Sequence, residues 1–233
     1  MVKVTVLVDV VAARADLVPC HGLSLLVEVG GSTVLFGTGP LLRVLEANMR
    51  RLGRELGEVD VLVIPMESRA VSGAAEEVAA RLADYAVIVA PQGLAVRAGK
   101  RRVKRVSSLV WLSEFLAVLP PVGHRRELAL VALGRRGPVL LLACSHVGSP
   151  AMIERAAREL GLSEMCGVVG GLHLSAHDLL TLADLEAALA RYRVKVVVPL
   201  FCTGLEAREK IIKSLRASDI SSDNLGCGLE CEF

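Results

Sequence analysis

The sequence predicts an α/β protein in which β-sheets are covered by helices. A short hairpin followed by alternating strands and helices occurs once in each half of the chain, and this alternation is typical of layered α/β folds. The 233 residues are 53% hydrophobic and 22% charged, so the chain can bury a substantial core and is not a disordered protein. No stretch rich in glycine, proline or serine divides it, and we expect one domain over residues 1–233.

The first half of the chain opens with strands and then alternates with helices. Two apolar segments meet at Gly30-Gly31, a dipeptide that favours a tight hairpin turn. Pro40 suits the first turn of a helix, because its fixed φ angle fits that position. The predicted strands are Met1–Asp9, Leu23–Glu28, Thr33–Phe36, Asp60–Ile64 and Ala86–Ala90, and the predicted helices are Leu41–Leu52 and Ala74–Leu82, the latter opening at Ser72-Gly73.

The second half repeats this order after a stretch of weak pattern. From Pro91 to Gly123 the sequence predicts irregular or meandering structure around Trp111 and Phe115. A second hairpin follows, with its turn at Gly134-Arg135-Arg136-Gly137. The remaining predicted elements are strands Glu127–Leu133, Val139–Cys144, Val168-Val169 and Lys195–Pro199, and helices Ala151–Leu160, Asp178–Ala190 and Leu205–Leu215.

Several short motifs occur in a recognisable order along the chain. They are His21-Gly22-Leu23-Ser24-Leu25-Leu26-Val27-Glu28, Val34-Leu35-Phe36-Gly37-Thr38-Gly39, Asp60-Val61-Leu62-Val63-Ile64, Cys144-Ser145-His146, Gly170-Gly171-Leu172-His173-Leu174 and Pro199-Leu200-Phe201-Cys202-Thr203-Gly204. Through these motifs most of the chain resembles the metallo-β-lactamase-fold hydrolases, in the branch that includes an archaeal dihydropterin-related synthase. The resemblance implies a four-layer αββα sandwich, with two mixed β-sheets flanked by helices.

The metal-binding pattern of that family is degenerate in this chain. The family has F-D-T-G after the hairpin, S-H-x-H-x-D-H after the next strand and H-C-T-G near the end, and these segments hold a two-metal site. Here Gly37 and Phe201 replace the aspartate and the last histidine. The four ligand positions of the central motif carry Met66, Ser68, Ala70 and Val71.

Two candidate metal ligands, His146 and His173, match the family pattern. Catalytic zinc generally needs about three protein ligands and an open position, and thioether or hydroxyl groups are poor substitutes. The pattern therefore indicates a hydrolase fold that has lost most of its metal ligands, and we expect no cofactor. A hydrogen-bonding role is the preferred interpretation for the two histidines.

Turns between strands and helices predict an anion site. Free backbone N–H groups at helix N-termini attract anions, and Arg69 stands inside the degenerate loop, beside Glu67. Ordinary N-caps and tight turns are the alternative interpretation. The expected ligand-binding residues, which would hold a small anionic molecule, are Thr38, Arg69, Ser72, His146, His173 and Thr203.

Two other functions stay open at this point. One is an enzyme with an altered site: either zinc or another divalent metal held by His146, His173 and a third ligand, or metal-free chemistry in which Cys202 pairs with one of these histidines. A soft-metal or thiol site that adds Cys144, Cys166 and Met66 is a weaker variant, since no C-x-x-C pair is present. The other function is that of a structural subunit in a homo-oligomer.

Charge and hydropathy argue against several further classes. The net charge of +2 gives no general attraction to nucleic acid, and the basic run from Arg97 to Arg105 contains no aromatic residue for base stacking. No apolar run reaches the roughly 18 residues of a membrane span, and the N-terminus is typical of a strand rather than a signal peptide, so we expect a cytoplasmic protein. Whether Cys227 and Cys231 form a disulfide depends on backbone geometry.

Overall fold

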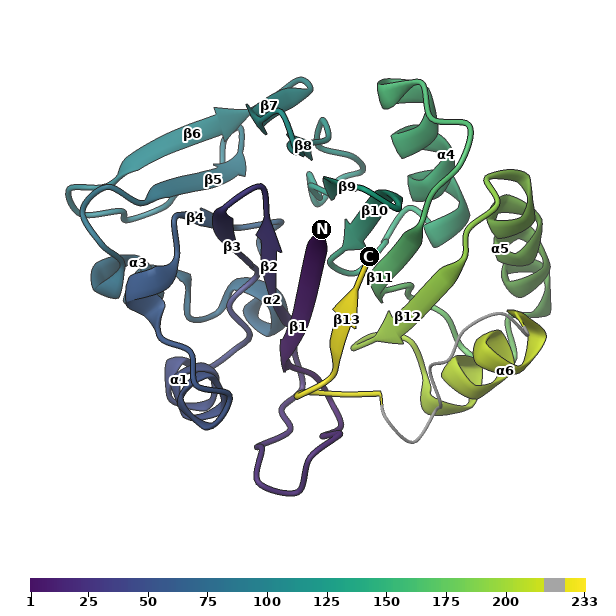
Figure 1. Cartoon of the computed structure of the whole chain (residues 1–233), viewed down its shortest axis with the longest axis horizontal. Coiled ribbons are helices and arrows are strands. Elements are labelled where there is room, and N and C mark those ends of the chain that lie inside the picture. Colours follow the sequence, from purple (N-terminus) through teal and green to yellow (C-terminus); the bar gives the residue numbers. More distant parts are fainter. Residues whose placement is uncertain (216–224) are drawn as a thin grey trace.

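The computed structural model describes residues 1–215 and 225–233, and it consists of two mixed β-sheets packed face to face between helices (Figure 1). The strand order is β13-β1-β2-β3-β4-β5-β6 in the seven-stranded sheet and β12-β11-β10-β9-β8-β7 in the six-stranded sheet. The four-layer αββα sandwich predicted from the sequence is confirmed.

The seven-stranded sheet is built mainly from the first half of the chain. Gly30 and Gly31 turn the β2–β3 hairpin with φ angles of 57° and 80°, which glycine adopts without strain. After β3 the strands run parallel to one another. The strands of this sheet are β1 (Val2–Val8), β2 (Ser24–Val29), β3 (Ser32–Phe36), β4 (Val61–Val63), β5 (Val87–Pro91), β6 (Arg102–Val106) and β13 (Glu230–Glu232).

The six-stranded sheet comes from the second half and follows the same plan. A β9–β10 hairpin precedes the parallel strands β10, β11 and β12. Its strands are β7 (Val110–Ser113), β8 (Leu116–Val118), β9 (Leu130–Gly134), β10 (Gly137–Leu142), β11 (Gly167–Gly171) and β12 (Val196–Leu200). Because parallel strands end at a common edge, the residues that follow β10, β11 and β12 lie close together.

Helices cover the outer face of each sheet. Those on the seven-stranded sheet are α1 (Leu42–Arg51), a 3-10 helix (Leu56–Glu58) and α3 (Ala75–Arg81), and those on the six-stranded sheet are α4 (Ser149–Leu160), α5 (Leu179–Arg191) and α6 (Leu205–Leu215). The short helix α2 (Arg69–Ser72) lies in the loop after β4, and its Val71 packs into the cluster between the two sheets. The side chain of Asp178 caps α5 by accepting the backbone N–H of Thr181 at 3.4 Å. The three helices predicted in the second half are confirmed, and each begins within two residues of its predicted start.

Three apolar clusters separate the layers. The central cluster joins the two sheets through residues such as Val4, Phe36 and Leu141. A second cluster lies between the first sheet and α1 and α3, and a third lies between the second sheet and α4, α5 and α6. Both faces of the inner strands therefore contact apolar side chains, which explains why these strands are almost continuous hydrophobic runs.

The structure corrects the sequence interpretation at three places. The predicted helix Ala74–Leu82 is confirmed as α3, but it does not open at Ser72-Gly73, because a separate short helix, α2, begins at Arg69 and ends at Ser72. The stretch from Pro91 to Gly123 contains three strands, β6, β7 and β8, of which β6 and β7 are the edge strands of their sheets. The C-terminal strand β13, missed in the sequence, pairs with β1.

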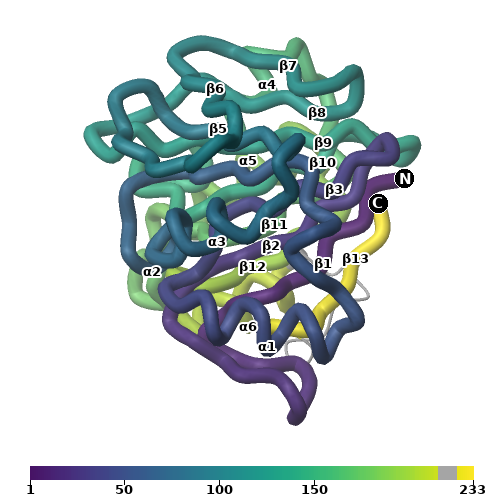
Figure 2. The backbone as a smooth tube through the Cα atoms, turned by 90° about the vertical axis from the view of Figure 1, so that its left-hand side faces the viewer, coloured from purple at the N-terminus to yellow at the C-terminus, as the bar shows by residue number. Residues whose placement is uncertain are grey.

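That pairing places the two ends of the chain side by side (Figure 2). The backbone of Val2 exchanges two hydrogen bonds with that of Phe233, at 3.0 and 2.8 Å. Cys231 belongs to β13 and Cys227 to the bridge that precedes it, and both are free thiols. Burial raises the pKa of each of these two thiols to about 11. Within the described ranges, no helix has both the length and the apolarity needed to cross a lipid bilayer.

Candidate functional site

Backbone strain marks the edge at which β10, β11 and β12 end. Ser145, His173 and Phe201 follow these three strands and adopt left-handed φ angles of 54°, 53° and 48°. Residues other than glycine rarely take this conformation, and when they do they cluster at functional sites. Three such residues at one sheet edge indicate that the fold holds this edge in a defined geometry.

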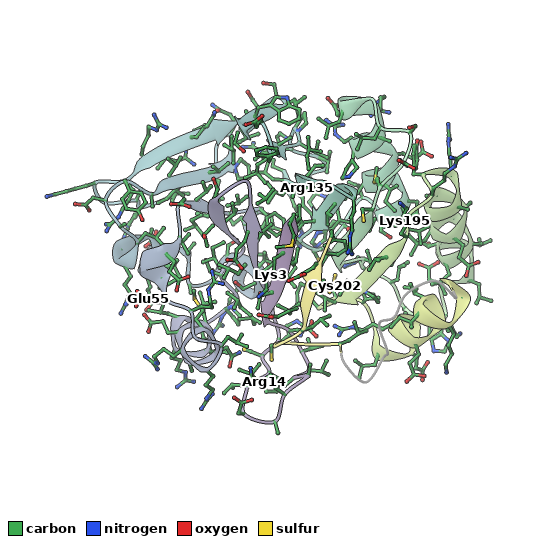
Figure 3. All side chains as sticks on the ribbon, viewed as in Figure 1. Lys3, Arg14, Glu55, Arg135, Lys195 and Cys202 are labelled. Carbon is green, nitrogen blue, oxygen red and sulfur yellow. The ribbon has the colours of Figure 1, made fainter. Side chains whose placement is uncertain are left out.

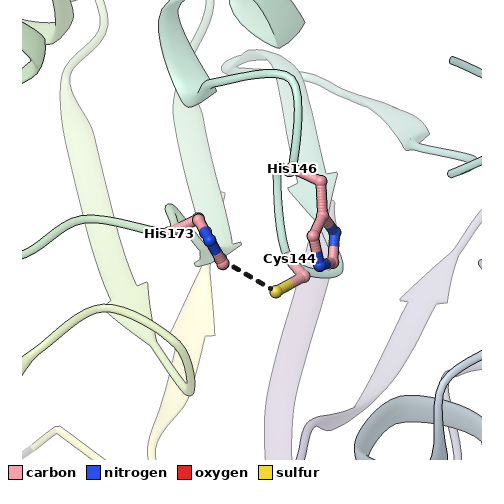
Figure 4. Close-up of side chains that lie close together, drawn as sticks. All are labelled: Cys144, His146 and His173. Carbon is pink, nitrogen blue, oxygen red and sulfur yellow. Dashed lines mark hydrogen bonds between the residues drawn. The ribbon is translucent and has the colours of Figure 1, made fainter. Parts of the chain in front are cut away.

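Three metal-ligating side chains meet at this edge (Figure 4). Cys144 Sγ lies 3.3 Å from His173 Nδ1, and the ring centroids of His146 and His173 are 4.9 Å apart. One sulfur and two nitrogen atoms, one from each residue, all lie within 4.8 Å of one another. Cys144 is buried, His146 is half-buried and His173 is exposed, so the group opens to solvent on one side.

A buried carboxylate, that of Glu127, organises the loop that carries two of these residues. Glu127 accepts the backbone N–H groups of Cys144 and Ser145 at 2.7 Å each and that of His146 at 3.1 Å. It also accepts a hydrogen bond from His146 Nδ1 at 3.2 Å, while its own side chain is 1% exposed. This leaves His146 Nε2 as the ring nitrogen that is free to bind a ligand.

The protonation of the cluster follows from its surroundings. A hydrogen bond with the Cys202 thiol, together with burial, raises the pKa of the Cys144 thiol far above its usual value. Burial and the neighbouring His146 lower the pKa of His173, so this imidazole is neutral near pH 7. Cys202 also donates to the Cys144 carbonyl at 3.4 Å, and it lies near the middle of the molecule (Figure 3). Cys202 thus contacts Cys144, but no contact joins it to either histidine among the described residues.

A cavity of about 770 Å³ lies beside the loop that follows β4. Arg69, Ser72 and Arg125 contribute polar groups to its wall, which also contains Ser68, Glu67 and Glu76. A neighbouring cavity of about 700 Å³ shares Glu67 and Arg125 and adds His124 and Arg126. The remaining lining residues are Pro40, Ile64, Met66, Gly73, Ala75, Leu94, Ala95 and Val96.

Comparisons with known proteins agree with this architecture. Tm1679, described as a metal-dependent hydrolase of the β-lactamase superfamily, superposes with a TM-score of 0.75 and 21% identity over 100% of this chain and 99% of its own. The metallo-β-lactamase-fold protein YhfI from Bacillus subtilis superposes with a TM-score of 0.67 and 11% identity, over 99% and 98% of the two chains. This chain has the metallo-β-lactamase fold.

Sequence comparison gives a shorter match within the same group of proteins. A 7,8-dihydropterin-6-methyl-4-(β-D-ribofuranosyl)-aminobenzene-5'-phosphate synthase from Methanocaldococcus jannaschii is 26% identical over 90 residues, which are 39% of this chain and 31% of the length of that relative. No protein-family model matches the chain. The resemblance predicted from the sequence motifs is therefore confirmed at the level of the fold, and the matched relative fits the predicted branch.

The two-metal centre associated with the metallo-β-lactamase fold does not fit these residues. The motif resemblance assigns Met66 and Val71 to two of its ligand positions, and both side chains are fully buried in the central apolar cluster. Phe201 occupies a third, with its ring packed edge-on against His21 at 5.3 Å between centroids. One ion can still be held by Cys144, His146 and His173, because thiolate sulfur and imidazole nitrogen are the ligands that zinc prefers.

The turns expected to offer free N–H groups use them within the fold. The N–H groups of Gly37, Thr38 and Gly39 donate to the carbonyls of Val63, Val71 and Leu23, at 2.7–3.0 Å. Gly204 N–H donates to Leu174 O at 2.9 Å. The expectation that these turns present free donors is wrong, because neighbouring backbone segments saturate them.

The six predicted ligand-binding residues divide into three groups. His146 and His173 belong to the Cys144 cluster, whereas Arg69 and Ser72 line the larger cavity. Thr38 and Thr203 are buried, and their hydroxyl groups bond to the backbone: Thr38 donates to Gly39 O at 3.1 Å, and Thr203 accepts from Leu172 N at 3.0 Å.

A buried ion pair fixes the loop that carries Phe201 and Cys202. Arg208, 2% exposed, donates to both carboxylate oxygens of Asp9, 0% exposed, at 2.8 and 3.0 Å. Asp9 accepts the Phe201 N–H at 2.6 Å, and Arg208 donates to Thr203 O at 3.0 Å. Sequence reasoning missed this pair as well as Glu127. The available signal was an acidic residue beside a strongly apolar strand: Asp9 directly follows β1, and Glu127 precedes β9 by three positions.

Proposed function

We propose that this protein binds a small anionic molecule in the cavity beside the β4 loop, and that it does not use the two-metal hydrolysis associated with its fold. The observation that carries the proposal is the pair of unpaired guanidinium groups in the wall. Within residues 1–215 and 225–233, neither Arg69 nor Arg125 has an ion-pair or hydrogen-bond partner for its side chain. A fixed positive charge of this kind favours phosphate or carboxylate.

The balance of charge in the cavity supports an anion. Glu76 forms an exposed ion pair with Arg97, whose Nε lies 3.8 Å from its carboxylate. Glu67 therefore remains to oppose Arg69, Arg125 and the adjoining Arg126. The three guanidinium groups exceed this single carboxylate, so an anionic group that enters the cavity meets net positive charge.

Polar and apolar groups together define the class of ligand. The Ser72 hydroxyl oxygen is buried and has no hydrogen-bond partner among the described residues, so it is available to a ligand. The half-buried Leu94 and Val96 supply an apolar wall, and the volume lies in the range typical of small-molecule sites. The name of the curated relative describes a pterin compound that carries a 5'-phosphate. We infer that the ligand joins an apolar or ring-shaped body to a phosphate or carboxylate.

Calorimetric titration with phenyl phosphate tests this proposal. The wild-type protein is expected to bind phenyl phosphate and not phenol, in buffer that contains EDTA so that no metal contributes. Arg125→Ala should weaken the binding about tenfold, because a hydrogen bond to a charged group contributes about 1.5–3 kcal/mol and 1.4 kcal/mol corresponds to a factor of ten.

The matched control is Arg136→Ala. Arg136 is exposed in the β9–β10 turn, at the end of β10 opposite the candidate site. This variant should bind phenyl phosphate with the wild-type affinity. Equal weakening in both variants, or equal binding of phenol and phenyl phosphate, would show that the cavity does not recognise an anion.

A further inference from the structure

We propose that Cys144, His146 and His173 form a binding site for one soft transition-metal ion of the zinc class. None of the three residues belongs to the wall of the anion cavity, and the site differs from the two-metal centre, since the central ligand motif of that centre is missing. Its third ligand, Cys144, comes from the same loop as His146. The sequence favoured a role without metal for His146 and His173. The structure brings the sulfur and the two imidazoles together from the ends of adjacent strands β10 and β11.

The separations between donor atoms fit a single ion. In a tetrahedral zinc site, bond lengths near 2.3 Å to sulfur and 2.0–2.1 Å to nitrogen place these two ligand atoms about 3.5 Å apart. Cys144 Sγ and His173 Nδ1 are 3.3 Å apart, and the nitrogen of His146 lies within 4.8 Å of both. Binding an ion therefore requires only a small approach of the half-buried His146 ring.

The surroundings of the three side chains are those of a metal site. Glu127 holds His146 Nδ1, so that Nε2 is the nitrogen presented to the ion, and carboxylate–histidine pairs of this kind orient metal ligands in many proteins. Glu127 also fixes the backbone on which Cys144 lies. The exposed side of His173 leaves room for a water molecule or another small ligand at a fourth position.

Binding replaces the thiol proton of Cys144 by the metal ion. The Cys144 S–H bond breaks, the sulfur–metal bond forms, and the proton passes to the buffer, with no change of oxidation state. Cys202 keeps its bond to the Cys144 carbonyl and is not a ligand in this assignment. The affinity should consequently rise with pH, as for other thiolate sites.

Titration of the metal-free protein with Co²⁺ tests the site by absorption spectroscopy. Tetrahedral cobalt with a thiolate ligand shows a sulfur-to-metal charge-transfer band in the near ultraviolet and intense visible bands. The wild-type protein is expected to saturate both signals at one Co²⁺ per chain, and Zn²⁺ should displace them. Cys144→Ser, which preserves the size of the side chain, should abolish the charge-transfer band.

Two control variants isolate the sulfur ligand. Cys166 is as buried as Cys144 but precedes β11, at the opposite end of the strands, and Cys202 is the neighbouring thiol. Cys166→Ser and Cys202→Ser should keep the band. Circular dichroism and a melting curve show that each variant is folded. A band that survives Cys144→Ser, or the absence of a band in the wild-type protein, would overturn the proposal, and neither result bears on phenyl phosphate binding measured in EDTA.

Discussion

Asp9→Ala is expected to lower the free energy of unfolding by about 3–5 kcal/mol, because it leaves the Arg208 guanidinium buried without a counter-charge. The variant also removes the acceptor for the Phe201 N–H. Urea denaturation followed by circular dichroism measures the change as a shift of the transition midpoint at constant slope. The loss should be accompanied by loosening of the loop that carries Phe201 and Cys202.

A second ion pair in the same helix provides the control for this prediction. Lys213 and Glu209 are exposed and lie 3.4 Å apart, so Lys213→Ala should change stability by less than about 1 kcal/mol. Asp9→Ala combined with Arg208→Met should recover part of the lost stability, since no uncompensated charge then remains. A double variant no more stable than Asp9→Ala would show that the ion pair is not the source of the effect.

Glu127→Ala is expected to cost about 3 kcal/mol or more. The substitution removes the acceptor of three backbone N–H groups at Cys144, Ser145 and His146, and each buried donor left unpaired costs about 1–3 kcal/mol. Urea denaturation again measures the total, and hydrogen exchange at residues 144–146 should locate it. These amides should lose protection more than those of β9 and β10.

The control for Glu127 is Glu114, an exposed residue between β7 and β8 that has no ion-pair partner in the described part of the chain. Glu114→Ala should stay within about 0.5 kcal/mol of the wild-type protein. A loss below about 1 kcal/mol in Glu127→Ala, with unchanged exchange at residues 144–146, would mean that the carboxylate does not hold this loop.

Much of the fold was predictable from local patterns. Turn glycines at Gly30 and Gly31, apolar strands and periodic helices each act over a few residues, so the sequence contains their signals directly. The three short strands between Pro91 and Gly123 were harder: β6 and β7 are partly exposed edge strands that alternate weakly, and β8 has only three residues. Strand β13 has only three residues and depends on pairing with β1 at the other end of the chain, which no local pattern reports.

The candidate site was predictable only in part for the same reason. The missing ligands at Met66 and Val71 could be identified by position, and so could the surviving His146 and His173. The contact of Cys144 with His173, 29 positions apart, depends on the register of parallel strands. The role of Glu127 depends on a loop that folds back over its carboxylate. Hydrogen bonds between segments so far apart produce no periodic pattern in the sequence.

Together, the two proposals give this metallo-β-lactamase fold one three-ligand metal site beside an anion cavity, in place of a two-metal centre. Elemental analysis of protein loaded with excess zinc and freed of unbound ions by gel filtration tests it most directly. We expect one zinc ion per chain. Two tightly bound ions per chain would contradict this expectation, because Met66, Val71 and Phe201 offer no metal ligand and residues 1–215 and 225–233 bring only one group of three ligating side chains together.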